Sequence, residues 1–103
     1  MSGLSVRLKN IKPWFLRRGA SCSHEDLIQD CPPSAAGCED CLRIGDTWVH
    51  LRKCLICGHV GCCDESKNKH ATKHFHATGH PIVQTIEPGE AWRWCYVDQI
   101  LLD

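Results

Sequence analysis

Cysteine and histidine are the residues of this sequence whose number and spacing point most directly to chemistry. The chain has nine cysteines and seven histidines among 103 residues, far above ordinary usage. Thiolate sulfur and imidazole nitrogen are ligands that zinc prefers, four to an ion in a tetrahedron. A chain of this length forms one domain with a modest apolar core, so bound metal is the expected source of its remaining stability.

Two pairs of cysteines have the spacing of a zinc-binding turn. Cys38 and Cys41 form one C-x-x-C pair, and Cys54 and Cys57 form the other. Each pair can supply half of a four-ligand site. A lone C-x-x-C pair could instead be redox-active, but two pairs followed by histidines favour metal. The candidates for the other halves are Cys62, Cys63, His70, His74, His76, His80 and Cys95.

A helix narrows this choice. The helix is expected to be capped by Asp64 or Ser66, to run to about residue 77, and to be ended by Gly79. His70 and His74 are four residues apart and project from one helix face, whereas residue 76 points away from it. Spacing alone leaves open which ion each of the two histidines would bind.

The rest of the chain predicts short strands that surround this helix. Residues 21–46 are rich in Pro, Gly, Ser and acidic residues, and are expected to form a loop region. Residues 54–59 resemble a zinc knuckle, and residues 87–90 a turn. Strands are expected at 47–51, 60–63, 81–86 and 91–96, with a last strand or tail at 98–102. The predicted fold is α+β, a small zinc-stabilised antiparallel sheet packed on one central helix.

Charge divides the chain into two parts. The 12 basic and 12 acidic residues balance, but residues 1–20 carry five basic residues and no acidic one. We expect 1–20 to be a basic N-terminal tail, with a short helix or a membrane-surface helix as alternatives, and 21–103 to be the domain. The domain is acidic and lacks a basic stripe, so no nucleic-acid partner is expected.

The cysteines also indicate a compartment. The N-terminal segment lacks the continuous apolar run of a signal peptide, and no stretch approaches the roughly 20 apolar residues of a membrane span. An odd number of cysteines in C-x-x-C pairs with downstream histidines is typical of metal binding in a reducing environment. We therefore expect a cytoplasmic protein with neither disulfides nor a membrane span.

The order of these residues resembles the UBP-type zinc finger. This family occurs in ubiquitin-specific proteases and in the C-terminal domain of a cytoplasmic histone deacetylase. The similarity covers residues 22 to about 102, and the chain looks most like the stand-alone bacterial members. The motifs that carry the resemblance are Cys38-x-x-Cys41, Trp48, Cys54-x-x-Cys57, Cys62, His70-Ala71-x-x-His74, Gly79-His80-Pro81 and Trp94-Cys95-Tyr96.

The resemblance implies how the ligands are divided among zinc ions. Metal-rich family members bind three ions in an interleaved arrangement. By position, one site would be Cys38, Cys41, Cys62 and His70, and a second would be Cys54, Cys57, His74 and His80. The third would be Cys22, His24, Cys95 and Asp98, with Asp98 in place of the family's last cysteine. Two or three zinc ions are therefore expected, with Cys31 and Cys63 left over.

The resemblance also implies an activity, the capture of a free C-terminal Gly-Gly tail of ubiquitin. Trp48, Trp94 and Tyr96 stand at the positions of the aromatic pocket that encloses this tail. The family's tail-binding arginine is replaced by Asp64, which would repel a carboxylate by roughly 4 kcal/mol at about 4 Å. The sequence therefore predicts a non-catalytic zinc module with a pocket for some other peptide or protein partner.

An enzyme is the alternative function. A zinc-dependent hydrolase needs three protein ligands and one open position for water, which an incompletely closed third site could provide. A nucleophilic thiol of Cys63 beside His59 or His76 is a second possibility of this kind.

Overall fold

The structure is a computed structural model that describes residues 22–102. Within that range the strands form one five-stranded sheet in the order β2-β1-β3-β4-β5, with every neighbouring pair antiparallel. The strands are β1 (Leu51–Cys54), β2 (Val60–Cys62), β3 (Ile82–Thr85), β4 (Arg93–Cys95) and β5 (Ile100–Leu102). The helices are the 3-10 helix η2 (Ser23–Leu27), α1 (Glu39–Ile44) and α2 (His70–Thr78). The predicted α+β class is confirmed.

The register of the strands divides their side chains between two faces, because cross-strand partners point the same way. One row consists of Cys54, Val83, Trp94 and Leu101. The row on the opposite face consists of Ile82, Cys95 and Ile100. This second row is buried in a core cluster with Leu55 and Leu102, against which Cys22 and Ile28 pack. The segment that carries η2 therefore covers one face of the sheet.

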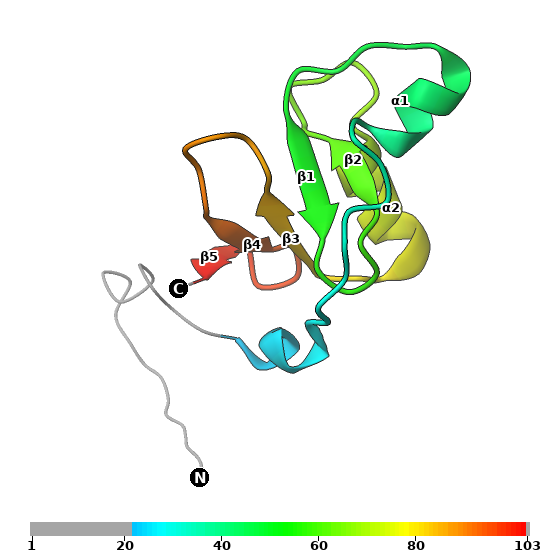
Figure 1. The fold of residues 1–103 in the computed structure, drawn as a ribbon. Coiled ribbons are helices and arrows are strands. Elements are labelled where there is room, and N and C mark those ends of the chain that lie inside the picture. The colour runs from blue at the N-terminus through cyan, green and yellow to red at the C-terminus, as the bar shows by residue number, and fades with distance from the viewer. Residues whose placement is uncertain (1–21, 103) are drawn as a thin grey trace, which may run out of the picture.

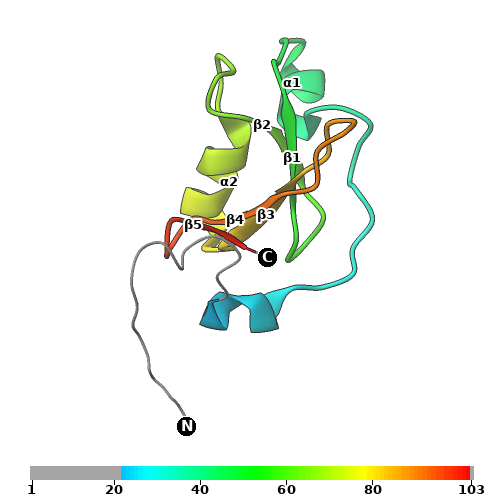
Figure 2. The ribbon, with the colours of Figure 1, turned by 90° about the vertical axis from the view of Figure 1, so that its left-hand side faces the viewer.

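Helix α2 packs against β2 and β1, and α1 packs against β2 (Figures 1 and 2). Gly61 in β2 permits this close approach, because a Cβ atom there would lie 2.6 Å from the backbone nitrogen of Ala71. Only a residue without a side chain fits between the strand and the helix. The helix therefore lies close enough to the sheet for its histidines to meet cysteines from β1 and β2.

Helix α2 begins later than the sequence predicted. Its first residue is His70, and the preceding residue, Lys69, has a left-handed backbone with φ of 51°. Neither Asp64 nor Ser66 caps it, because the Ser66 hydroxyl accepts a hydrogen bond from the backbone of Val49 at 2.9 Å instead. The helix ends at Gly79 in the left-handed conformation, as predicted.

Two other predictions needed correction. The strand expected at 47–51 occupies Leu51–Cys54, because the Val49 and Leu51 amides donate to side chains of Ser66 and Glu87 rather than to a neighbouring strand. The region expected to be a loop, 21–46, contains η2 and α1. The sheet therefore packs against two α-helices in the described range, not against one alone.

No helix among the described residues is long and apolar enough to cross a membrane. The predicted basic tail, 1–20, lies outside the described range.

Candidate metal centres and pocket

The first candidate metal centre joins α1, β2 and the first residue of α2. Cys38 caps α1, Cys41 lies in its first turn, Cys62 ends β2, and His70 begins α2. The Nδ1 atom of His70 lies 3.3, 3.3 and 3.6 Å from the sulfurs of Cys38, Cys41 and Cys62. All three cysteines are fully buried.

The second centre joins the knuckle after β1 to the middle of α2 and to the segment just beyond its end. Cys54 ends β1, and Cys57 follows in the turn. The Cys57 sulfur lies 3.3 Å from Nε2 of His74, and the Cys54 sulfur 3.6 Å from Nδ1 of His80. His80 folds back beyond Gly79, so its ring lies 5.4 Å from that of His74. His70 and His74 of α2 thus belong to different centres.

The third centre joins the start of η2 to the end of β4 and the turn that follows it. Nδ1 of His24 lies 3.6 Å from the Cys95 sulfur and 3.2 Å from a carboxylate oxygen of Asp98. Cys22 completes the cluster. The side chains of His24 and Asp98 are 27% and 38% exposed, so this centre is more open to solvent than the first, whose three cysteines are buried.

The donor atoms of these clusters are spaced as zinc requires. In each cluster all four lie within 4.8 Å of one another. Bonds of about 2.0–2.3 Å in a tetrahedron place ligand atoms roughly 3.3–3.8 Å apart, which matches the measured sulfur–nitrogen distances. Backbone amides also point at the sulfurs, from Cys41 to Cys38, from His70 to Cys62 and from Asp98 to Cys95. Such donors favour a thiolate, the form that binds metal.

Burial favours the protonated form of these thiols when no metal ion is bound. Desolvation raises the pKa of Cys22 and of Cys38 to about 12, and it also raises the pKa of Cys54. Buried thiols in a metal-free chain therefore keep their protons. A divalent cation reverses this preference by pairing with the thiolates, so zinc binding must release protons.

The side chains of His59, which the sequence suggested only as a partner of the Cys63 thiol, and of Asp40 support the second centre. The His59 ring stacks on the His74 ring with centroids 4.1 Å apart and planes 4° apart. His59 in turn lies 2.9 Å from the carboxylate of Asp40, on α1. Asp40 holds the His59 ring, and the stacked His59 ring in turn restricts the orientation of the candidate ligand His74. The proximity of His59 to 54–57 in sequence was the only hint.

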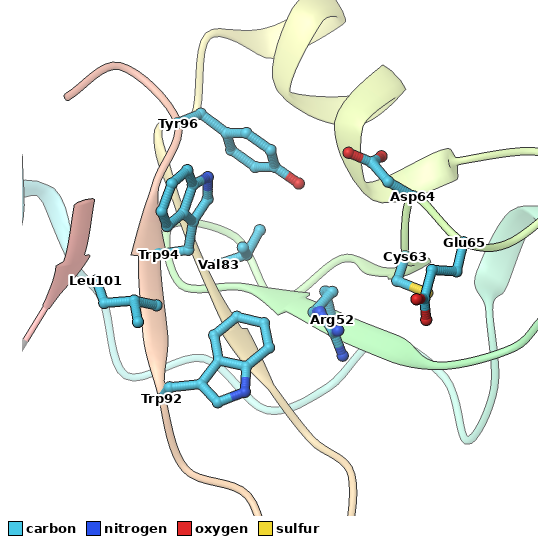
Figure 3. A pocket seen from close by; sticks show the side chains of 9 residues that line it. All are labelled: Arg52, Cys63, Asp64, Glu65, Val83, Trp92, Trp94, Tyr96 and Leu101. Carbon is cyan, nitrogen blue, oxygen red and sulfur yellow. The ribbon is translucent and has the colours of Figure 1, made fainter. Parts of the chain in front are cut away.

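A cavity of about 340 Å³ lies on the face of the sheet opposite the η2 segment (Figure 3). Trp94 and Tyr96 line it together with Trp92. Residues 92, 94 and 96 alternate with Arg93 and Cys95, so their aromatic rings share one face. Tyr96 also stacks on Phe75 of α2, with ring centroids 4.7 Å apart.

The prediction that Trp48 lines this pocket is not supported. Trp48 packs instead against the cluster of Cys38, Cys41 and Cys62, and its ring approaches Gly37 so closely that a Cβ atom there would lie 2.6 Å away. Trp48 is separated from the pocket because it precedes β1 and packs beside α1 rather than on the sheet. The third aromatic side chain of the pocket is Trp92, two residues before Trp94.

The charges around the pocket are of both signs. The Arg52 guanidinium lies 4.4 Å from the centre of the Trp92 ring and donates to the Thr85 hydroxyl at 3.2 Å. Asp64 and Glu65 line the side of the cavity across from the Trp92 and Trp94 rings (Figure 3). The pocket therefore has one cation against an aromatic wall and two carboxylates across from it. The sequence could not place Arg52, because only the register of β1 brings it here.

The Asp64 carboxylate is partly engaged within the protein. One of its oxygens accepts a hydrogen bond from the Thr72 hydroxyl at 2.6 Å, and the same hydroxyl lies 3.4 Å from the Tyr96 oxygen. Burial raises the pKa of Tyr96, and the charge of Asp64 acts in the same direction. The phenol therefore stays protonated and keeps a hydrogen to donate.

A small antiparallel sheet and two helices joined through Cys/His clusters define a zinc-binding module. Residues 38–102 match the zf-UBP family, described as "Zn-finger in ubiquitin-hydrolases and other protein". The chain belongs to this family of zinc fingers, and its clusters fit two or three zinc ions.

A solved structure and several curated proteins are similar to the chain. The solution NMR structure of protein RPA1320 from Rhodopseudomonas palustris is 60% identical, covers 82% of each chain, and gives a TM-score of 0.76. Ubiquitin carboxyl-terminal hydrolase 44 of Ailuropoda melanoleuca is 34% identical over 73 residues, which is 69% of this chain and 9% of that protein. BRCA1-associated protein of Homo sapiens is 34% identical over 55 residues, 53% of this chain and 8% of that protein. The chain thus spans less than a tenth of these two relatives.

Proposed function

We propose that this chain is a non-catalytic zinc module that presents its aromatic pocket to the C-terminal end of a peptide or protein partner. The observation that carries the proposal is the Arg52 guanidinium held over Trp92 at the edge of the pocket. The three candidate centres would hold up to three zinc ions, by the ligand sets described above. These ions would fix the strands and helix that shape the pocket rather than react.

The chemistry of the pocket suits a chain end. A terminal carboxylate needs a cation and hydrogen-bond donors, which Arg52 and the Tyr96 hydroxyl offer. Flat aromatic walls at Trp92 and Trp94 leave space for the small residues of an extended tail. The cavity, about 340 Å³, is at the lower end of the size of ligand pockets, so it would take the last few residues of a chain only.

The carboxylates limit which tail can bind. An anion about 4 Å from Asp64 would be repelled by roughly 4 kcal/mol at an effective dielectric constant of 20. Arg52 could offset this repulsion only for an anion that lies close to the guanidinium. The partner's carboxylate must therefore lie at the Arg52 end of the pocket. Because Asp64 replaces the family's arginine, we do not propose the tail of ubiquitin as the partner. A cytoplasmic location is also part of the proposal, because thiolate sites persist in a reducing compartment.

The test is a titration with short peptides that end in small residues, in which tryptophan fluorescence measures binding. Peptides with a free C-terminus should bind, and the same peptides with an amidated C-terminus should bind much more weakly. Because a hydrogen bond to a charged group contributes about 1.5–3 kcal/mol, Arg52→Met should raise Kd by about 10- to 100-fold.

Arg43→Met is the matched control, because Arg43 lies on α1 and pairs with Asp40 away from the pocket. Its Kd should equal that of the unmodified protein. Equal affinity for free and amidated peptides would refute the capture of a chain end. A ubiquitin with its native tail is expected to bind no better than the amidated peptides.

The alternative is a zinc-dependent hydrolase that uses the third centre. That reaction would need an open coordination position, whereas four candidate donors converge there. Hydrolysis of an ester or peptide that is lost in Asp98→Ala, with the fold retained, would favour the enzyme.

A further inference from the structure

A fourth group of metal-ligating side chains lies outside the three centres. It consists of His50, Cys63 and Glu65, whose donor atoms all lie within 4.8 Å of one another. Nδ1 of His50 is 3.6 Å from a carboxylate oxygen of Glu65, a separation that suits two ligands of one ion. None of the three residues belongs to the three four-donor clusters, and the family resemblance gives Cys63 no ligand role.

Backbone contacts hold these side chains together without help from metal. The Cys63 amide donates to the His50 carbonyl at 2.9 Å, which extends the pairing of β1 and β2 by one step. The Ser66 amide donates to the Cys63 carbonyl at 2.9 Å and closes a turn that carries Glu65. The Ser66 hydroxyl accepts from Val49 on the other segment. Both segments that supply donors are therefore fixed against each other.

The Cys63 thiol is buried and has a long contact with one hydroxyl group. Cys63 is 6% exposed, and its sulfur meets the Ser66 hydroxyl at 3.6 Å. The side chains of His50 and Glu65 are 43% and 78% exposed, so an ion could enter from solvent and lose its water there. A thiolate, an imidazole and a carboxylate form a donor set that suits zinc, cobalt or cadmium.

We propose that His50, Cys63 and Glu65 form an additional divalent-metal site at the rim of the pocket. It would use three protein ligands and leave a coordination position for water, unlike the four-donor clusters. Cys63 and Glu65 also line the pocket (Figure 3). The bound ion would therefore add positive charge beside Asp64 and weaken the repulsion of an anionic ligand.

The first test counts ions. Zinc-loaded protein is dialysed, titrated with zinc or cadmium, and examined by native mass spectrometry and calorimetry. The unmodified protein should take up one equivalent more than Cys63→Ser, His50→Ala or Glu65→Gln, whatever the occupancy of the third centre. Glu65 is exposed, so Glu65→Gln should fold even where the substitution of Cys63 does not.

The matched controls are Cys31→Ser and His76→Ala, because both residues lie outside every candidate cluster. Each should keep the full number of ions. Equal uptake by the unmodified protein and all three site variants would overturn the proposal, as would loss of the same ion in either control.

The second test uses the thiol itself. Added zinc should slow the alkylation of Cys63 several-fold, measured by peptide mass spectrometry, and should leave the alkylation of Cys31 unchanged. An unchanged rate at Cys63 across the titration would contradict metal binding by this sulfur.

Discussion

Asp98 is the residue on which the third zinc centre depends. Its carboxylate lies 3.2 Å from Nδ1 of His24, and Asp98 is the most exposed of the four residues in this cluster. Carboxylate oxygen binds zinc at about the same distance as imidazole but is a harder ligand than thiolate. The third ion should therefore be the first of the three to leave during chelation.

Substitution of Asp98 should show this directly. Asp98→Ala removes a ligand, so its effect should exceed the roughly 10- to 100-fold loss of metal affinity that follows when a hydrogen-bond partner of a ligand is removed. The variant should keep two zinc ions and the same sheet. Asp98→Cys should hold three ions more tightly than the natural chain. Native mass spectrometry during a chelator titration measures both.

A result in which Asp98→Ala and the natural chain lose ions at the same chelator concentration would show that Asp98 is no ligand. Asp26→Ala is a suitable control, because Asp26 lies in η2 and belongs to no candidate cluster.

At the scale of elements, prediction from the sequence was correct where residue spacing is local. The C-x-x-C pairs, the i,i+4 histidines and the glycine after α2 predicted a knuckle, a helix end and the candidate ligands. It failed where tertiary contacts decide. Residues 64–69 bridge to the segment before β1 instead of extending α2, because Ser66 and Asn68 bond to Val49 and Asp46. Likewise, only strand register places Arg52 in the pocket, whereas the alternation of Trp92 with Trp94 and Tyr96 was visible in the sequence.

The packing of α2 on β2 gives a prediction at this scale. Gly61→Ala would place a methyl group 2.6 Å from the Ala71 nitrogen and 2.8 Å from its Cα. The atoms that the methyl group would meet belong to the backbone of α2 and cannot rotate away as a side chain could. The helix must therefore shift, at a cost of about 1–3 kcal/mol in the free energy of unfolding. The shift would also move His70 from Cys62.

Urea unfolding of the zinc-loaded protein measures this loss, and the absorption of a cobalt-substituted sample reports the distortion of the first centre. An unchanged midpoint together with an unchanged spectrum would mean that the strand and helix tolerate the methyl group.

For the whole molecule, metal binding and protonation compete. The pKa of His74 is lowered to about 4 by burial, and then by its neighbours His59 and His80, from an ordinary value of 6.5. Between these two values the unfolded chain binds this proton and the folded chain does not. The stability that depends on neutral His74 is therefore present above about pH 6.5 and is lost as the pH falls toward 4. Zinc bound by His74 acts in the same direction.

We expect acidification through that window to release zinc and to unfold the domain together. The melting temperature by circular dichroism and the free zinc detected with a chromophoric chelator should change over the same pH range. His76→Ala should leave both curves unchanged, since His76 lies on the exposed side of α2. A melting temperature that stays constant from pH 6.5 to 4 would disprove this account.

The alternation of side chains along β4 has a consequence for how such a domain can diverge. Trp92, Trp94 and Tyr96 face the pocket, while Cys95 faces the third centre. A single inserted or deleted residue in 92–96 would exchange the two faces, placing the cysteine in the pocket and an indole in the metal cluster. Substitutions at one face can therefore accumulate independently of the other, whereas a change in the length of this strand would abolish both sites at once.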